Sequence, residues 1–141
     1  MNIYRVLILL AALVLAGCNS NQPAAAEGPS DVLKQYVAAS QKQDIATMKA
    51  LLSKDSLKYI EEKAKSLNLT LDDVLKKETE VKLRSAPETR NEKIEGETAT
   101  VEVKNPATGA FDVKYPFVKE NGAWKLARDK YIEEELRKQS K

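Results

Sequence analysis

The chain of 141 residues has no histidine and a single cysteine. Histidine is the most common general base near neutral pH, so its absence excludes serine–histidine and cysteine–histidine catalysis. It also leaves zinc only carboxylate ligands, which is a rare arrangement. One cysteine cannot form a disulfide within the chain, so packing of the core must stabilise the fold.

The sequence also lacks the motifs that hold phosphates or activate a nucleophile. It contains no glycine-rich phosphate loop, and no serine is followed by lysine at the third position. The acidic runs Glu61-Glu62 and Glu133-Glu134-Glu135 lack the spacing of a calcium loop. The sequence therefore predicts no catalytic residue, no metal site and no cofactor.

Neither sign of charge dominates the chain. Lysine and arginine number 23 and aspartate and glutamate 21, for a net charge of +2. The two signs are interleaved along the sequence, as on a solvated surface. With this balance of charges, electrostatics gives no reason to expect binding of nucleic acid or anionic lipid.

The first 17 residues have the layout of a signal peptide. Arg5 supplies a positive charge, Val6–Ala16 is an apolar run of 11 residues, and Gly17 precedes Cys18. A membrane-spanning helix needs about 20 apolar residues, so this run is too short to be one. The segment Leu15-Ala16-Gly17-Cys18 resembles the lipobox of bacterial lipoproteins.

The lipobox resemblance implies that residues 1–17 are removed and that Cys18 becomes the lipidated first residue. A lipoprotein cysteine carries at least two acyl chains, which anchor a protein stably in a membrane. The implied location is the bacterial cell envelope, and Asn19 favours the periplasmic face of the outer membrane over the inner membrane. The alternative is an ordinary secretory peptide that precedes a free thiol.

Residues 18–28 form the lipidated cysteine and a segment rich in polar residues and alanine, which predicts a flexible tether. The remaining residues, 29–141, are enough for one domain. Four short helices are expected between residues 30 and 78, because apolar residues recur there at three-and-four spacing. The expected N-caps of these helices are Ser30, Asp44, Ser53 and Thr70, the last forming a capping box with Asp73.

After Pro87 the apolar residues alternate with polar ones, which indicates strands. Strands are expected over residues 98–103, 111–117 and 124–126. Glu95-Gly96 and Asn121-Gly122 are typical of tight turns between strands. Pro116 lies within a strand and predicts an edge or a bulge.

Two segments fit this pattern less simply. Ile132–Lys141 predicts an additional polar helix with only Ile132 and Leu136 to bury. Val81 and Leu83 fit either the end of a helix or the start of a strand, and both alternatives stay open.

Helices followed by an antiparallel meander predict an α+β domain with the helices packed on a curved sheet. Three segments resemble lipoproteins of the nuclear-transport-factor-2-like superfamily, which has a cystatin-like fold: Pro29–Leu52, Gly96–Val103 and Asn121–Leu126. The resemblance covers about residues 29–130 and departs at the C-terminal segment. It implies a cone-like domain in which a curved sheet wraps around helices and leaves a cavity at the open end.

The candidate residues for a cavity lie on apolar faces. The expected lining of the cavity or core consists of Tyr36, Met48, Tyr59, Val113, Tyr115, Phe117 and Trp124. Asp112 and Asp129 fall on the polar side of their expected strands, so both are expected at the solvated surface. Among the helical carboxylates, Glu61, Glu62, Asp72 and Asp73 are those that would turn inward if a helix face were misplaced.

The resulting functional hypothesis is a lipid-anchored envelope protein with a non-catalytic domain that binds an apolar small molecule or another envelope protein. The alternative is a small cavity enzyme of the polyketide-cyclase or ketosteroid-isomerase type. A buried carboxylate with few hydrogen bonds inside a cavity would favour the enzyme. A cavity lined by apolar groups and tyrosine would favour ligand binding, and a filled interior with an exposed apolar patch would favour a protein partner.

Overall fold

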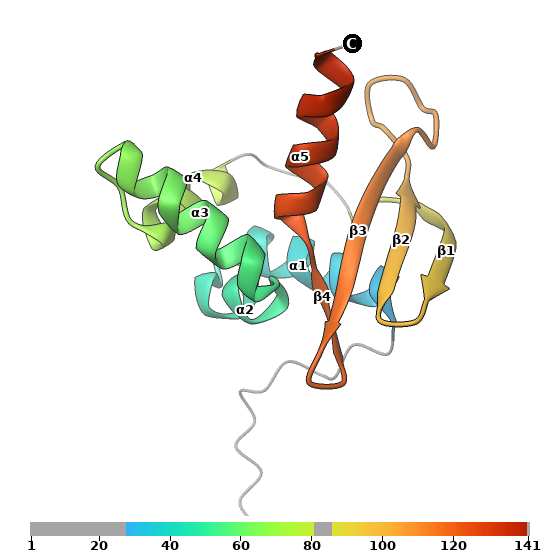
Figure 1. The fold of residues 1–141 in the computed structure, drawn as a ribbon, viewed down its shortest axis with the longest axis horizontal. Helices are drawn as coiled ribbons and strands as arrows, with labels where there is room; N and C mark the ends of the chain where they lie inside the picture. Colours follow the sequence, from blue (N-terminus) through green and yellow to red (C-terminus); the bar gives the residue numbers. More distant parts are fainter. Residues whose placement is uncertain (1–27, 81–85, 141) are drawn as a thin grey trace, which may run out of the picture.

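The computed structural model describes residues 28–80 and 86–140 (Figure 1). The predicted signal peptide, Cys18, the predicted tether before Gly28, Val81 and Leu83 lie outside these residues. The helices are α1 (Pro29–Gln41), α2 (Ile45–Leu51), α3 (Lys54–Ser66), α4 (Leu71–Glu80) and α5 (Arg128–Gln139). The strands are β1 (Thr89–Glu95), β2 (Thr98–Val103), β3 (Val113–Glu120) and β4 (Ala123–Leu126).

The predicted α+β class is confirmed for the described residues. The strands form one antiparallel sheet in the order β1-β2-β3-β4, and the sheet is open. Helix α1 lies behind the sheet and contacts β1, β2 and β4, whereas α2, α3 and α4 gather beside it (Figure 1). Helix α5 follows β4 and contacts β3 and α3. None of the helices in the described ranges is long and apolar enough to cross a membrane.

Three of the four predicted helix caps are confirmed. The Asp44 carboxylate accepts a hydrogen bond from the Thr47 backbone N–H, and the Ser53 hydroxyl accepts one from the Ser56 N–H. The prediction for Ser30 is wrong, because α1 begins two residues earlier than a cap at Ser30 requires. Gly28 is its N-cap, and Pro29 occupies the first helical position, where a missing N–H costs nothing.

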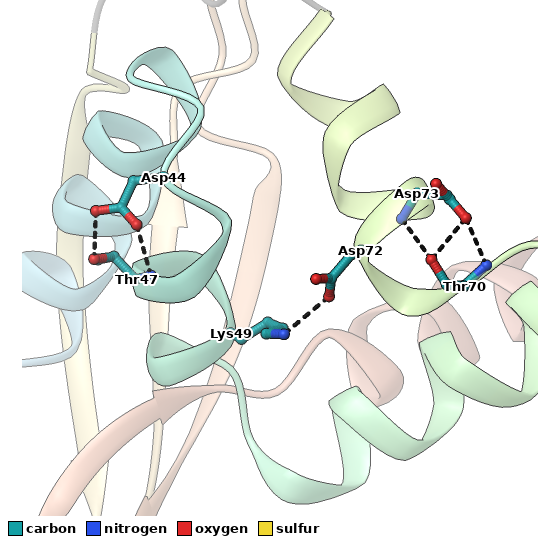
Figure 2. A network of polar contacts seen from close by, with 6 residues as sticks. All are labelled: Asp44, Thr47, Lys49, Thr70, Asp72 and Asp73. Atoms are coloured by element: carbon teal, nitrogen blue, oxygen red, sulfur yellow. Dashed lines mark hydrogen bonds and ion pairs between the residues drawn. The ribbon is translucent and has the colours of Figure 1, made fainter.

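Figure 2 shows the capping box and its neighbours. The Asp73 carboxylate accepts from the Thr70 backbone N–H and hydroxyl, while the Asp73 N–H donates to the Thr70 hydroxyl. Next to this cap, Lys49 on α2 forms an ion pair with Asp72 on α4 at 2.9 Å. The capping box thus fixes where α4 begins, and an exposed ion pair links α4 to α2.

Both predicted turns are confirmed. Asn121 and Gly122 have φ values of 50° and 80°, as a type I′ turn requires, and Gly96 between β1 and β2 has a φ of 63°. Strand β1 is an exposed edge strand, and its pairing with β2 is irregular between Arg90 and Lys93. Such irregularity and charge discourage pairing with further strands.

Strand β3 departs from the sequence-based expectation in two ways. It begins at Val113, so Phe111 and Asp112 belong to the preceding loop. Pro116 marks neither an edge nor a bulge, because β3 pairs regularly with β2 and has β4 on its other side. The β4 strand ends opposite Phe117, and the Pro116 carbonyl accepts from Ala127 there. The missing N–H of proline is therefore tolerated where the β3–β4 pairing stops.

The core lies between the sheet and the helices. Phe117 on β3 is 1% exposed and Met48 on α2 is fully buried, and both join residues of α1, β2 and β4 in one cluster. The C-terminal helix begins at Arg128 and not at Ile132, and none of its residues is fully buried. Since α5 packs by one side only, its position depends on contacts near its first turn.

Candidate functional site

A pocket of about 180 Å³ lies between α1, α4, the sheet and the start of α5. Most of its wall is apolar or aromatic, and one end is polar. The lining residues are Leu33, Tyr36, Val37, Glu78, Tyr115, Leu126, Arg128, Tyr131 and Ile132. The pocket therefore combines residues from both ends of the domain sequence.

Three polar side chains close one end of the pocket, and we refer to Tyr36, Glu78 and Arg128 as the polar trio. The Tyr36 hydroxyl donates to Glu78 Oε1 at 3.1 Å. Arg128 Nη1 donates to the Tyr36 hydroxyl at 3.0 Å and to Glu78 Oε2 at 2.5 Å. Each oxygen of the Glu78 carboxylate thus has a partner within the trio.

The sequence brings these residues together from three helices. Tyr36 lies on the buried face of α1, three residues after Leu33. Glu78 lies three residues after the buried Leu75 and so continues the inner face of α4. Arg128 is the first residue of α5, directly after the buried Leu126-Ala127.

Two members of the polar trio, Tyr36 and Arg128, keep one protonation state at neutral pH. Burial, reinforced by the Glu78 carboxylate, raises the pKa of the Tyr36 phenol far above its usual value of 10.0. For Arg128, burial lowers the pKa, but Tyr36 and Glu78 outweigh it, so the pKa lies above its usual value. The phenol therefore stays protonated and the guanidinium stays charged, and neither can exchange a proton near pH 7.

Two tyrosines form an aromatic wall of the pocket. The rings of Tyr115 on β3 and Tyr131 on α5 are stacked, with centroids 4.8 Å apart and planes 19° from parallel. Burial raises the pKa of both phenols, so these hydroxyls also stay neutral. The stack ties the first turn of α5 to the sheet beside the polar trio.

The structure divides the residues that the sequence placed in a cavity or core. Tyr36 and Tyr115 line the pocket. Met48, Phe117 and Trp124 are buried in the core and do not line the pocket. Tyr59 and Val113 pack against the core from partly exposed positions.

The expectation for the two aspartates is corrected. Asp112 is exposed, but it lies in a loop and not on a strand. Asp129 is half-buried in the first turn of α5, where it accepts a hydrogen bond from the Ser56 hydroxyl at 2.6 Å. Strand alternation does not apply to Asp129, because the chain leaves β4 at Leu126 and turns into a helix.

The carboxylate that lines the pocket is not among those the sequence singled out. Glu61, Glu62, Asp72 and Asp73 are all exposed. Glu78 was missed, although a glutamate at helical spacing from Leu71 and Leu75 was a usable signal. Arg128 and Tyr131 were missed because the C-terminal helix was expected to begin only at Ile132, whereas it begins at Arg128.

Within the described residues, no group of three or more His, Cys, Asp or Glu side chains is arranged to hold a metal ion. The pocket instead offers aromatic faces, aliphatic carbon and one ion pair with a phenol. Comparison with protein-family models, with curated proteins and with solved structures finds no match for this chain.

Proposed function

We propose that this protein is a lipid-anchored component of the bacterial cell envelope whose domain binds a small molecule in the pocket without chemically changing it. The observation that carries this proposal is the lining of the pocket, which is apolar and aromatic except for the polar trio. The lipobox-like segment ending at Cys18 supports the anchor, with the periplasmic face of the outer membrane as its favoured location. The pocket lies between α1 and the open sheet, and this position supports the proposed relationship of the domain to the cone-like fold.

The size of the pocket limits the ligand. Sites for drug-sized molecules usually have volumes of about 300–1,000 Å³. The pocket here is about 180 Å³, close to the roughly 150 Å³ of a cavity that holds benzene. A single ring or a short branched molecule fits, whereas a complete lipid does not.

Binding is favoured over catalysis because the carboxylate in the pocket is already engaged. Glu78 accepts from Tyr36 with one oxygen and from Arg128 with the other. A cavity enzyme of the isomerase type needs a carboxylate that is free to take a proton from its substrate. The neutral phenols around the pocket are also poor proton acceptors at pH 7.

Binding of a small molecule is also favoured over docking of a protein. Among the described residues, the large apolar side chains that are exposed are Leu67 at the end of α3, Ile94 on β1 and Leu136 on α5. Helix α3 and strand β1 lie on opposite sides of the molecule (Figure 1). Leu67 and Ile94 therefore do not belong to one contiguous patch of the kind that marks a protein interface.

The binding proposal is tested by thermal unfolding of the full chain on phospholipid vesicles, followed by the circular dichroism of its helices, so that wild type and tryptophan variants are read by the same signal. A panel of small neutral compounds is screened against the wild type and against Ile132→Trp, which fills the pocket. A ligand at about ten times its Kd stabilises by about 1.4 kcal/mol and raises Tm by about 5 °C.

We expect at least one compound to raise Tm in the wild type and not in Ile132→Trp. Leu136→Trp is the matched control, since Leu136 lies one turn further along α5 and is 58% exposed. Equal responses of the wild type and Ile132→Trp to every compound would refute binding in this pocket.

The anchor is tested separately. Cys18→Ala should abolish incorporation of labelled palmitate and leave the chain uncleaved or outside the membrane fraction. Equal labelling of the wild type and Cys18→Ala would refute the lipoprotein proposal.

A further inference from the structure

We propose that the ligand is a small, uncharged molecule with one aromatic ring and one hydrogen-bond acceptor. The ring lies against the Tyr115–Tyr131 stack, and the acceptor meets the free edge of Arg128. This inference rests on the proposed binding function and specifies its ligand class. Three features of the pocket support it: the cancelling charges at its polar end, its aromatic lining, and the N–H donors of Arg128 that have no partner.

The charge of the pocket favours a neutral ligand. Glu78 and Arg128 are paired, so their charges cancel at the polar end. A charged ligand would lose its hydration and gain no opposite charge that is free to pair with it. Arg128 attracts an anion while Glu78 repels it, and the reverse holds for a cation, so the pair gives neither sign of charge a net attraction.

The wall of the pocket favours an aromatic ring. Tyr115 and Tyr131 stack with their centroids 4.8 Å apart, and Leu33 and Ile132 supply aliphatic carbon to the same pocket. Aromatic rings gain from offset stacking and edge contacts with other rings beyond the burial of their area. A volume of about 180 Å³ admits one ring and a short substituent.

The unused donors of Arg128 favour an acceptor on the ring. A guanidinium has five N–H donors. Among the described residues, the hydrogen bonds of Arg128 run through Nη1, to Tyr36 and Glu78. The edge formed by Nε and Nη2 has no partner there, and the side chain is only 25% exposed. A carbonyl oxygen on the ligand would satisfy these donors.

The test is titration calorimetry of the full chain anchored to phospholipid vesicles, with bare vesicles as the blank. Benzamide is the probe, because it is neutral and planar and carries a carbonyl acceptor. Benzoate has the same ring and size but a charge, cyclohexanecarboxamide has the amide without an aromatic ring, and acetamide has no ring. A ligand this small is expected to bind with a Kd of roughly millimolar order.

We expect benzamide to bind the wild type at least tenfold more tightly than each of the three other compounds. Ile132→Trp should abolish binding of benzamide, and Leu136→Trp should leave it unchanged. Arg128→Lys keeps the positive charge beside Glu78 but removes the planar edge, and it should weaken benzamide roughly fivefold, as expected for one lost hydrogen bond. If Arg128→Lys fails to fold by circular dichroism, the pair of tryptophan variants still decides the site.

Four results would count against this proposal. Benzoate binding as tightly as benzamide would refute the charge argument, and benzamide binding unchanged in Ile132→Trp would refute the site. Tighter binding of cyclohexanecarboxamide, lost in Ile132→Trp, would reject the aromatic ligand while leaving the proposed binding function intact. If none of the four compounds binds and no compound in the wider screen stabilises the protein, both the ligand class and the proposed binding function are rejected.

Discussion

Arg128 and Asp129 are neighbours at the start of α5, but their side chains join this helix to different parts of the molecule. Arg128 donates to Tyr36 on α1 and to Glu78 on α4, at the end of the pocket. Asp129 accepts from Ser56 on α3. The first turn of α5 is thus held from two sides, by an ionic group and by hydroxyls.

The two sides differ in their access to solvent. The side chains of Arg128 and Glu78 are 25% and 30% exposed, so the ion pair keeps part of its hydration. Ser53 and Ser56, which hydrogen-bond each other beside Asp129, are 1% and 0% exposed. Partial hydration lowers the cost of holding charges inside the domain. We infer that both groups fix α5, and that only the polar trio responds to a ligand in the pocket.

The largest effect is expected for Glu78→Ala. This change leaves the Arg128 guanidinium without its carboxylate and removes the acceptor of the Tyr36 hydroxyl. Breaking a fully buried pair costs about 3–5 kcal/mol, and partial exposure reduces this to about 2 kcal/mol. Urea unfolding measures the loss of the free energy of unfolding.

The matched control is Glu61→Ala, which removes an exposed ion pair with Lys65 within α3. That loss should stay below about 0.5 kcal/mol. Equal losses for the two variants would show that the polar trio does not hold α5.

A smaller effect is expected for Ser56→Ala. The Ser56 hydroxyl donates to the Asp129 carboxylate at 2.6 Å and has the Leu126 carbonyl within 3.2 Å. Its removal takes the short hydrogen bond away from the half-buried Asp129 carboxylate and the acceptor away from the buried Ser53 hydroxyl, at a cost of about 1–2 kcal/mol in urea unfolding. Ser66→Ala, which removes an exposed bond to its own helix, should cost less than about 0.5 kcal/mol.

The ligand separates the two groups further. If only the polar trio responds to a ligand, Ser56→Ala keeps the wild-type affinity for a pocket ligand, whereas Glu78→Ala changes that affinity. A loss of affinity in Ser56→Ala at unchanged fold would show that the buried hydroxyls shape the pocket.

The third effect appears only at alkaline pH. Burial raises the pKa of Tyr36 in the folded protein, so the unfolded chain releases this proton first as the pH rises. Above about pH 10 the folded state holds more protons than the unfolded state, and stability therefore falls with rising pH. One such group contributes at most about 1.4 kcal/mol per pH unit.

Tyr36→Phe removes this contribution. We expect its free energy of unfolding to fall less steeply than that of the wild type between about pH 10 and 11. Urea unfolding at both pH values gives the difference. If the free energy of unfolding fell equally steeply with pH in both proteins, the Tyr36 phenol would not be buried and protonated as described.

Polar contacts within one helical turn could be predicted from the sequence, and those between distant elements could not. The caps at Asp44 and Thr70 join residues three positions apart, so local spacing contains all the necessary information. In the polar trio, Tyr36 and Arg128 are 92 positions apart. These two residues come into contact because of how α1 and α5 pack. Rules that relate residues within one helical turn do not predict that packing.

The start of α5 shows the same limit. Its N-cap, Ala127, offers no side-chain hydrogen bond, so the usual signal of a helix start is missing. The helix is fixed instead by Asp129 with Ser56 and by the stack of Tyr131 on Tyr115. In the sheet, by contrast, alternation and the Asn121-Gly122 turn located β2 and the β3–β4 hairpin, because their rules act between neighbouring residues, although alternation started β3 two residues early.

The smallest effect is expected at a local contact, the capping box of α4. The Asp73 carboxylate accepts from the Thr70 hydroxyl at 2.6 Å and from its backbone N–H at 2.9 Å. These bonds, first the one from the hydroxyl, lower the pKa of Asp73 below its usual value of 3.8. The resulting stabilisation is complete above the pKa of the unfolded chain and is lost as the pH falls through the folded pKa.

Asp73→Asn keeps the shape of the side chain and one acceptor but carries no charge. We expect the wild type to have the higher urea midpoint at pH 7, and the gap to close as the pH is lowered from about 5 to 2. Asp55→Asn is the control, because Asp55 is also in a first helical turn but the structure shows no hydrogen bond to its side chain from the described residues. A gap for Asp73→Asn that stays constant with pH would mean that Asp73 caps α4 through its shape alone, without its charge.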